Sequence, residues 1–266
     1  MDKTLAKGLT VLEALVRSEG PCGVSDLAAS LGMSKSNAHR LLNTLVDTGF
    51  VTSANGRYSP TLKVWELGAR VIRTYDVRAL ARPAMTRLVR ETAESVRLSV
   101  LDPDHLEVVW IDKIDSPQDV RPFSELGGRV PAWCTSSGKA LLAYQSDEVI
   151  ARVSRKLKAR TKHTLVDRQA FIRELKKVKT DGYAYNDRGF TPLVRGVSAP
   201  IFGTEDEPVA SLTVVAPAER MPQPVLKKFA ALVCEAAAAV SAQMRPAPRE
   251  PVQSTRGDTK QRKLSA

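Results

Sequence analysis

The segment that decides the fold runs from Val24 to Thr48, VSDLAASLGMSKSNAHRLLNTLVDT, and it holds two short helical patterns separated by a tight turn. Asp26–Leu31 forms the first pattern, and Gly32 and Met33 form the turn. Ser34 then stands where an N-cap begins a second helix over residues 35–48. Two short helices joined by so tight a glycine-containing turn are typical of a helix-turn-helix. The segment therefore predicts a DNA-binding domain.

The second helix is expected to have an apolar and a polar face. The apolar side chains follow the spacing of a buried stripe, namely Ala38, Leu41, Leu42, Leu45 and Val46. The polar face has no carboxylate before Asp47, and Arg and Asn side chains can read base edges in the major groove. The predicted DNA-binding residues on this face are Lys35, Ser36, Asn37, His39, Arg40 and Asn43. An ordinary solvated helix face is the alternative interpretation.

A β-hairpin is predicted next. Asn55-Gly56 separates two short strand-like runs, and this dipeptide is the strongest short-range signal for a hairpin. A hairpin after the recognition helix indicates a wing, which adds Arg57 and Tyr58 to the predicted DNA-binding residues. We expect Arg40 to reach a base edge and Lys35 and Arg57 to bind phosphate. An ordinary charge beside a turn is the alternative for Arg57.

The net charge of +11 is unevenly distributed. Residues 1–60 hold six Lys and Arg against five Asp and Glu. DNA binding must therefore depend on a few well-placed cations. The densest basic stretch, residues 152–179, has eleven Lys and Arg against two acidic residues. This stretch could be a solvated helix face or a second nucleic-acid surface, and we favour the solvated helix face.

Several classes of protein and site are not expected. The sequence has no apolar run of about 18 residues for a membrane span. It begins without the pattern of a secretory signal, so we expect a cytoplasmic protein. The cysteines Cys22, Cys134 and Cys234 are far apart, which argues against a disulfide framework or a zinc cluster. The three histidines are scattered, and neither a metal nor a cofactor is expected.

The remaining chain predicts a linker and a second domain. Residues 63–78 are predicted to form a linker helix. Leu62, just before it, and Trp65 and Ile72 within it are our candidates for contact between subunits. Residues 79–245 alternate between helix and strand with few parallel βαβ units, which favours an antiparallel α+β domain. We expect strands near 96–100, 106–111, 183–187, 194–202 and 208–216, and a helix over 222–243. The basic tail, 246–266, is predicted to be disordered.

A series of short motifs runs along residues 5–244, namely Lys7-Gly8-Leu9, Val11-Leu12, Ser34 to Leu42, Gly49-Phe50-Val51, Arg57-Tyr58, Ala81-Arg82-Pro83, Gly127 to Pro131, Thr135 to Ala140, Asp181 to Ala184 and Ala199 to Phe202. In this order they resemble the IclR family of bacterial transcription regulators. The resemblance implies a winged helix-turn-helix over residues 1–62, a linker helix over 63–78 and a GAF-like effector-binding domain over 79–245. It also implies a homodimer or dimer of dimers on double-stranded operator DNA, and we expect a repressor.

The resemblance also suggests an effector pocket. Matched by position, its residues are Val130, Ser136, Ser137, Asn186, Gly196, Thr213 and Val215. Thr135 is a natural N-cap, so the backbone N–H groups of Ser136 and Ser137 could bind a carboxylate. Plain capping without a ligand is the alternative. The stretch from Asn186 to Gly189 is poorer in acid than is usual in the family, so we expect a small organic acid with Arg188 as a second anchor.

One enzymatic alternative starts from the same residues. Ser136-Ser137-Gly138-Lys139 satisfies the S-x-x-K pattern of serine acyl enzymes. The companion Lys-Thr-Gly is absent. Ala140 stands where a phosphate loop needs a hydroxyl. We therefore expect a regulator and not an enzyme, with a small-molecule hydrolase using Ser136 and Lys139 as the alternative.

Overall fold

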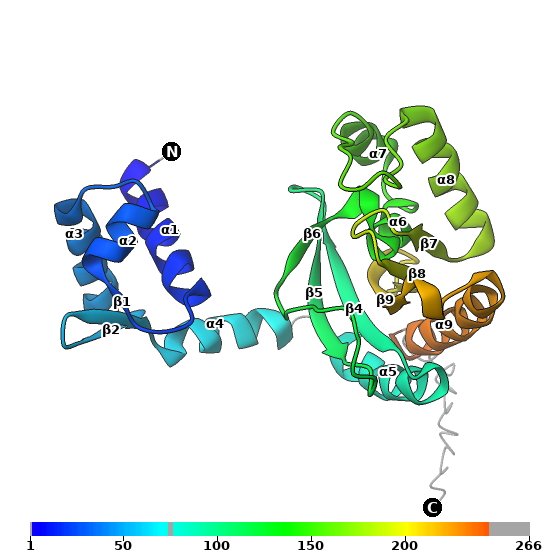
Figure 1. The fold of residues 1–266 in the computed structure, drawn as a ribbon, viewed down its shortest axis with the longest axis horizontal. Coiled ribbons are helices and arrows are strands. Elements are labelled where there is room, and N and C mark those ends of the chain that lie inside the picture. The colour runs from blue at the N-terminus through cyan, green and yellow to red at the C-terminus, as the bar shows by residue number, and fades with distance from the viewer. Residues whose placement is uncertain (1, 74–76, 245–266) are drawn as a thin grey trace, which may run out of the picture. The chain divides into compact units, whose positions relative to one another are not determined.

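The computed structural model describes residues 2–73 and 77–244, and the chain divides into two compact units, residues 1–76 and 77–266 (Figure 1). Each unit has its own core. The first contains α1 (Lys3–Arg17), β1 (Cys22–Gly23), α2 (Val24–Ser30), α3 (Lys35–Asp47), β2 (Val51–Ala54), β3 (Arg57–Pro60) and α4 (Leu62–Arg73).

The first unit is a winged helix-turn-helix. Gly32, in the turn between α2 and α3, has a φ of +61°, a conformation that glycine adopts without strain. The Ser34 hydroxyl accepts a hydrogen bond from the Asn37 N–H at 3.3 Å and caps α3. In the wing, Asn55 and Gly56 both have positive φ, as a two-residue type I′ turn requires. Helices α1, α2 and α3 and a small antiparallel sheet of order β1-β3-β2 enclose the core.

The linker differs in part from its prediction. Helix α4 ends at Arg73, and residues 77 and 78 already belong to α5 (Val77–Thr92). Residues 74–76, the Ile72 side chain and the predicted disordered tail lie outside the described residues. Leu62 and Trp65 are 76% and 70% exposed. Their role in subunit contact stays a prediction.

The second unit is built on one antiparallel sheet of order β6-β5-β4-β9-β8-β7. This arrangement confirms the predicted α+β class. Its strands are β4 (Ser95–Asp102), β5 (Glu107–Ile114), β6 (Arg129–Pro131), β7 (Ala184–Asp187), β8 (Val194–Phe202) and β9 (Pro208–Pro217). Its remaining helices are α6 (Ser136–Leu142), α7 (Asp147–Ser154), α8 (Arg168–Asp181) and α9 (Gln223–Met244), with 3-10 turns at Ala132–Cys134 and Ala218–Arg220.

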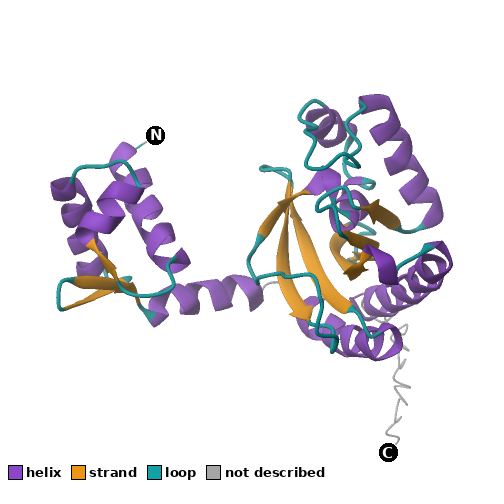
Figure 2. Ribbon diagram, viewed as in Figure 1, coloured by secondary structure: helices purple, strands orange, loops and turns teal. Residues whose placement is uncertain are grey.

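Helices cover both faces of this sheet (Figure 2). On one face α5 and α9 pack on alternate apolar residues of the central strands, such as Val96 and Leu98 of β4 and Leu212 of β9. On the other face α6 lies across β8, β9 and β4, and α7 and α8 pack outside it. Because both faces are covered, even the polar residues of the central strands are buried, including Arg97 and Ser99.

The basic stretch 152–179 is not one helix. Helix α7 ends at Ser154 and α8 begins at Arg168, with a loop between them. Helix α8 buries Phe171, Leu175 and Val178 and exposes Lys176, so its cations lie on a solvated face.

Within residues 2–73 and 77–244, no helix is long and apolar enough to cross a membrane. The three cysteines are free, and the described residues contain no group of three or more metal-binding side chains.

Candidate DNA-contact surface and effector pocket

Helix α3 presents the predicted polar face to solvent. Lys35, Ser36, His39, Arg40 and Asn43 are exposed, whereas Ala38, Leu41 and Leu42 are buried. Arg40 donates to the Asn37 amide oxygen at 3.3 Å, and His39 Nδ1 lies 3.5 Å from the Asn43 amide nitrogen. The described contacts of these polar groups are thus local to the helix, which leaves the face open to a partner.

The wing exposes only one of its two predicted DNA-binding side chains. Tyr58 is only 6% exposed and packs in the core of the first unit, so its side chain offers little surface for the predicted DNA contact. A residue on one face of a short hairpin must point inward when its neighbour points outward. Arg57 is exposed, and its guanidinium donates to the Pro21 carbonyl at 2.9 Å.

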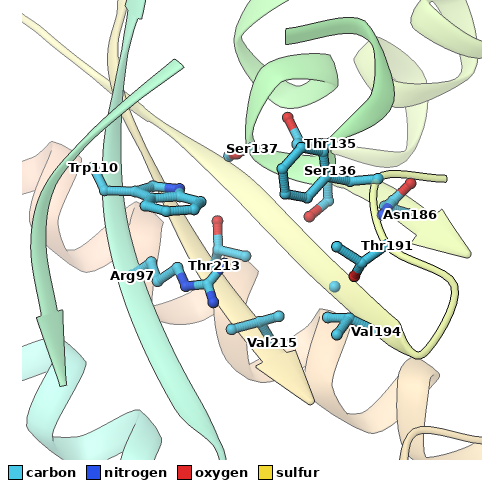
Figure 3. Close-up of a pocket in the computed structure, with 12 residues that line it drawn as sticks. Arg97, Trp110, Thr135, Ser136, Ser137, Asn186, Thr191, Val194, Thr213 and Val215 are labelled. Carbon is cyan, nitrogen blue, oxygen red and sulfur yellow. The ribbon is translucent and has the colours of Figure 1, made fainter. Parts of the chain in front are cut away.

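A pocket in the second unit lies between α6, the sheet and the chain after β7 (Figure 3). It contains about 410 Å³ of space not filled by protein atoms, part of it open to solvent. Six of the eight predicted effector residues line it: Ser136, Ser137, Asn186, Gly196, Thr213 and Val215. The other lining residues are Arg97, Trp110, Thr135, Phe190, Thr191 and Val194.

Two predicted effector residues do not line the pocket. Val130 is 3% exposed and packs in the apolar core beneath α6. The Arg188 side chain forms an ion pair with Asp187, with Nε 2.8 Å from Oδ1, and Arg195 binds the same carboxylate. The hydrogen bonds from Arg188 and then Arg195 lower the pKa of Asp187 to about 2. Arg188 therefore neutralises its neighbour and is not an anchor inside the pocket.

Helix α6 is held by its cap and by close backbone packing. The Thr135 hydroxyl accepts from the Gly138 N–H at 3.1 Å, as predicted. A Cβ at Gly138 would lie 2.0 Å from the Ala132 carbonyl oxygen, and a Cβ at Gly196 would lie 2.8 Å from Ser136 Oγ. The glycine of the Ser-x-x-Lys pattern thus serves packing.

A chain of hydroxyls forms the polar wall next to α6. Ser198 donates to Ser136 Oγ at 2.8 Å and lies 2.7 Å from Thr213 Oγ1. Since a serine has a single hydroxyl proton, Thr213 must then donate to Ser198. The Ser136 proton is left free for an acceptor in the pocket.

Lys139 does not serve this hydroxyl chain. Its ammonium is buried and binds Glu174 Oε1 at 3.0 Å and the Tyr185 carbonyl oxygen. Burial lowers the pKa of Lys139, and Glu174 opposes that shift. Lys139 therefore joins α6 to α8 and β7, and the Ser136–Lys139 pair of the hydrolase alternative is not formed.

The pocket contains a cation that was not predicted as a site residue. Arg97 of β4 is 8% exposed, and its guanidinium lies over the Trp110 ring at 4.6 Å from the ring centroid. Gly128 leaves room for this ring, because a Cβ at position 128 would lie 2.9 Å from Trp110 Cε3. In an alternating strand, Arg97 reads as a solvent-facing residue. Its burial depends on tertiary contacts with Trp110 and with the loop that holds Pro122 and Phe123.

Comparisons with known proteins agree with both units. Residues 4–54 match the IclR helix-turn-helix domain, and residues 69–242 match the bacterial transcriptional regulator IclR C-terminal domain. The chain is 31% identical to the regulator KdgR of Escherichia coli over 245 residues, 91% of this chain and 92% of that protein. It is 28% identical to the repressor IclR of Escherichia coli over 243 residues, 90% of this chain and 89% of that protein.

The chain belongs to the IclR family. Among solved structures, the Thermotoga maritima IclR is similar, with a TM-score of 0.76, 28% identity and coverage of 92% of this chain and 99% of that one. An IclR homolog from Microbacterium hydrocarbonoxydans, solved with 4-hydroxybenzoate, has a TM-score of 0.80, 26% identity and coverage of 91% and 99%. This IclR-family chain is a DNA-binding transcription regulator and not an enzyme.

The position of Gly138 yields a stability prediction. Gly138→Ala should destabilise the second unit by about 3 kcal/mol, because the new methyl group would overlap backbone that cannot move aside. Gly20→Ala is the control, since a Cβ at Gly20 meets no atom within 4 Å. Urea unfolding of both variants measures the difference. Equal stability of the two variants would contradict the proposed packing of α6.

Proposed function

We propose that this regulator is a repressor and that a small organic acid in the pocket controls its binding to operator DNA. The charge of the pocket carries this proposal: of its twelve described lining residues, eleven are uncharged and the twelfth is Arg97. A pocket with one positive charge in an otherwise uncharged lining favours a singly charged anion. The 4-hydroxybenzoate complex of a relative and the repressor name of another support the same conclusion.

We propose further that two or more copies bind a pseudo-palindromic operator. One recognition helix reads only a few base pairs, which is too little to select a site in a genome. Leu62 and Trp65 are exposed on α4 and are large enough to bury apolar surface between subunits. This supports the homodimer or dimer of dimers expected from the sequence.

Arg40→Ala should remove most of the preference for operator over random DNA, a loss of about 1–3 kcal/mol, because Arg40 is our candidate for a base contact. Arg57→Ala should weaken binding to every sequence alike, because that residue is assigned to phosphate. An operator selected from random duplexes and fluorescence anisotropy provide the measurement. Preserved preference in Arg40→Ala, together with lost preference in Arg57→Ala, would reverse the two roles.

Organic acids should weaken operator binding by about tenfold, a typical coupling between two sites. We would titrate the protein–operator complex with benzoate, 4-hydroxybenzoate and pyruvate, and with the neutral amide of each acid as its control. Release by at least one acid and not by its amide is expected. A response to amides alone, or to none of these compounds, would contradict control by an organic acid.

A further inference from the structure

Arg97 is a buried cation that forms no ion pair with a carboxylate of the described residues. Its Nη2 donates to the carbonyl oxygens of Pro122 and Phe123 at 3.4 and 3.3 Å, which are long hydrogen bonds. Its Nε is buried and has no hydrogen-bond partner among the described residues. Asp115 is exposed and forms its own ion pair with Lys113 at 2.9 Å.

This burial is unfavourable unless an anion compensates it. Burial lowers the pKa of Arg97 to about 10, and Asp115 opposes the shift. The side chain is still charged at neutral pH. Buried cations in folded proteins are normally paired, because an unpaired one loses its hydration without replacement. The stacked Trp110 ring compensates only part of that loss.

The geometry around Arg97 is that of a binding site. Figure 3 shows the guanidinium below Trp110 and directed toward the middle of the pocket, with Asn186 and Thr191 on the opposite side. Trp110, Phe190, Val194 and Val215 are the large apolar residues of the lining. A ligand that fits has an anionic end, a flat apolar body and a polar group at its far end.

We propose that Arg97 is the anion-binding residue of the pocket and that the effector is an aromatic monocarboxylate whose carboxylate binds this guanidinium. The proposal rests on the organic-acid control proposed above and adds its anchor and orientation. Nη1, which forms no hydrogen bond with the described residues and is not enclosed as Nε is, would donate to the carboxylate. A hydroxyl at the far end of the ring would meet the donor of Ser136 and the amide of Asn186.

The same charges argue against a second carboxylate on the ligand. Lys139 is paired with Glu174, and Arg188 and Arg195 are paired with Asp187. Of the described lining residues, those other than Arg97 are uncharged. A second carboxylate would therefore be buried without a cation. We expect terephthalate, which carries carboxylates at both ends of its ring, to bind more weakly than 4-hydroxybenzoate.

The test compares ligands and variants of the full-length protein by calorimetry. The probes are 4-hydroxybenzoate, its neutral analogue 4-hydroxybenzamide, and terephthalate. The variants are Arg97→Met, which keeps an apolar stem without the charge, Arg97→Lys, which keeps the charge, and the control Arg188→Met. Arg188 is a matched control because it is close in sequence to Asn186 but paired outside the pocket lining.

Wild type and Arg188→Met should bind the acid at least about tenfold more tightly than the amide, the effect of charge-assisted hydrogen bonds. Arg97→Met should lose the preference for the acid, because the acid loses a charge-assisted contact and the amide loses only a neutral one, and Arg97→Lys should keep part of the preference. The melting temperature of unliganded Arg97→Met should equal or exceed that of wild type, because the variant removes an unpaired buried charge.

Three results would overturn the proposal. If wild type binds neither 4-hydroxybenzoate nor terephthalate, the aromatic class of ligand is wrong, whereas organic-acid control itself fails only if none of the acids tested above releases the operator. If wild type prefers the acid and Arg97→Met keeps that preference, only the assignment of Arg97 is wrong. A fall in melting temperature with equal loss of acid and amide binding would make Arg97 a structural residue and also overturn its assignment.

Discussion

Helix α6 packs so closely on the six-stranded sheet that position 138 has no room for a side chain. A Cβ there would lie 2.0 Å from the Ala132 carbonyl oxygen. A Cβ at Gly196 of β8 would likewise lie too close to Ser136, at 2.8 Å from its Oγ. This approach places the start of α6 beside the polar residues of β8 and β9. The layer on the second face of the sheet builds on it, because α7 and α8 pack outside α6.

Closing that face changes the energetics of every polar side chain on it. The hydroxyls of Ser136, Ser198 and Thr213 form a hydrogen-bonded chain that leaves the Ser136 proton free. Arg97 finds two long hydrogen bonds and an aromatic ring, and its Nε stays unpaired within the described residues. The cost of this buried charge is physically reasonable in a regulator, since it would be offset when an anionic signal binds.

Much of the architecture could be predicted from the sequence because local patterns decide it. The tight turn at Gly32 and the Asn55-Gly56 hairpin depend on backbone conformations that few residues adopt. The strands and the last helix follow their apolar periodicity to within a few residues. Most of the pocket could be placed by its resemblance to a known family.

The structure differs from the predicted site residues where tertiary packing decides which side chains reach the surface or the pocket. Tyr58 and Val130 are in motifs, but their side chains complete cores that only the folded units define. Arg188 is next to the pocket in sequence and is paired with Asp187. Arg97 could not be recognised as a site residue, because alternation in one strand does not reveal the tertiary contacts that bury its side chain.

A crystal structure of the full-length protein with 4-hydroxybenzoate tests the central claim most directly. The account predicts density in the pocket of Figure 3 with a carboxylate oxygen about 3 Å from Arg97 Nη1. The phenolic hydroxyl should lie toward Ser136 and Asn186. A ligand in the reverse orientation, or bound elsewhere while Arg97 keeps only the Pro122 and Phe123 carbonyls, would contradict it.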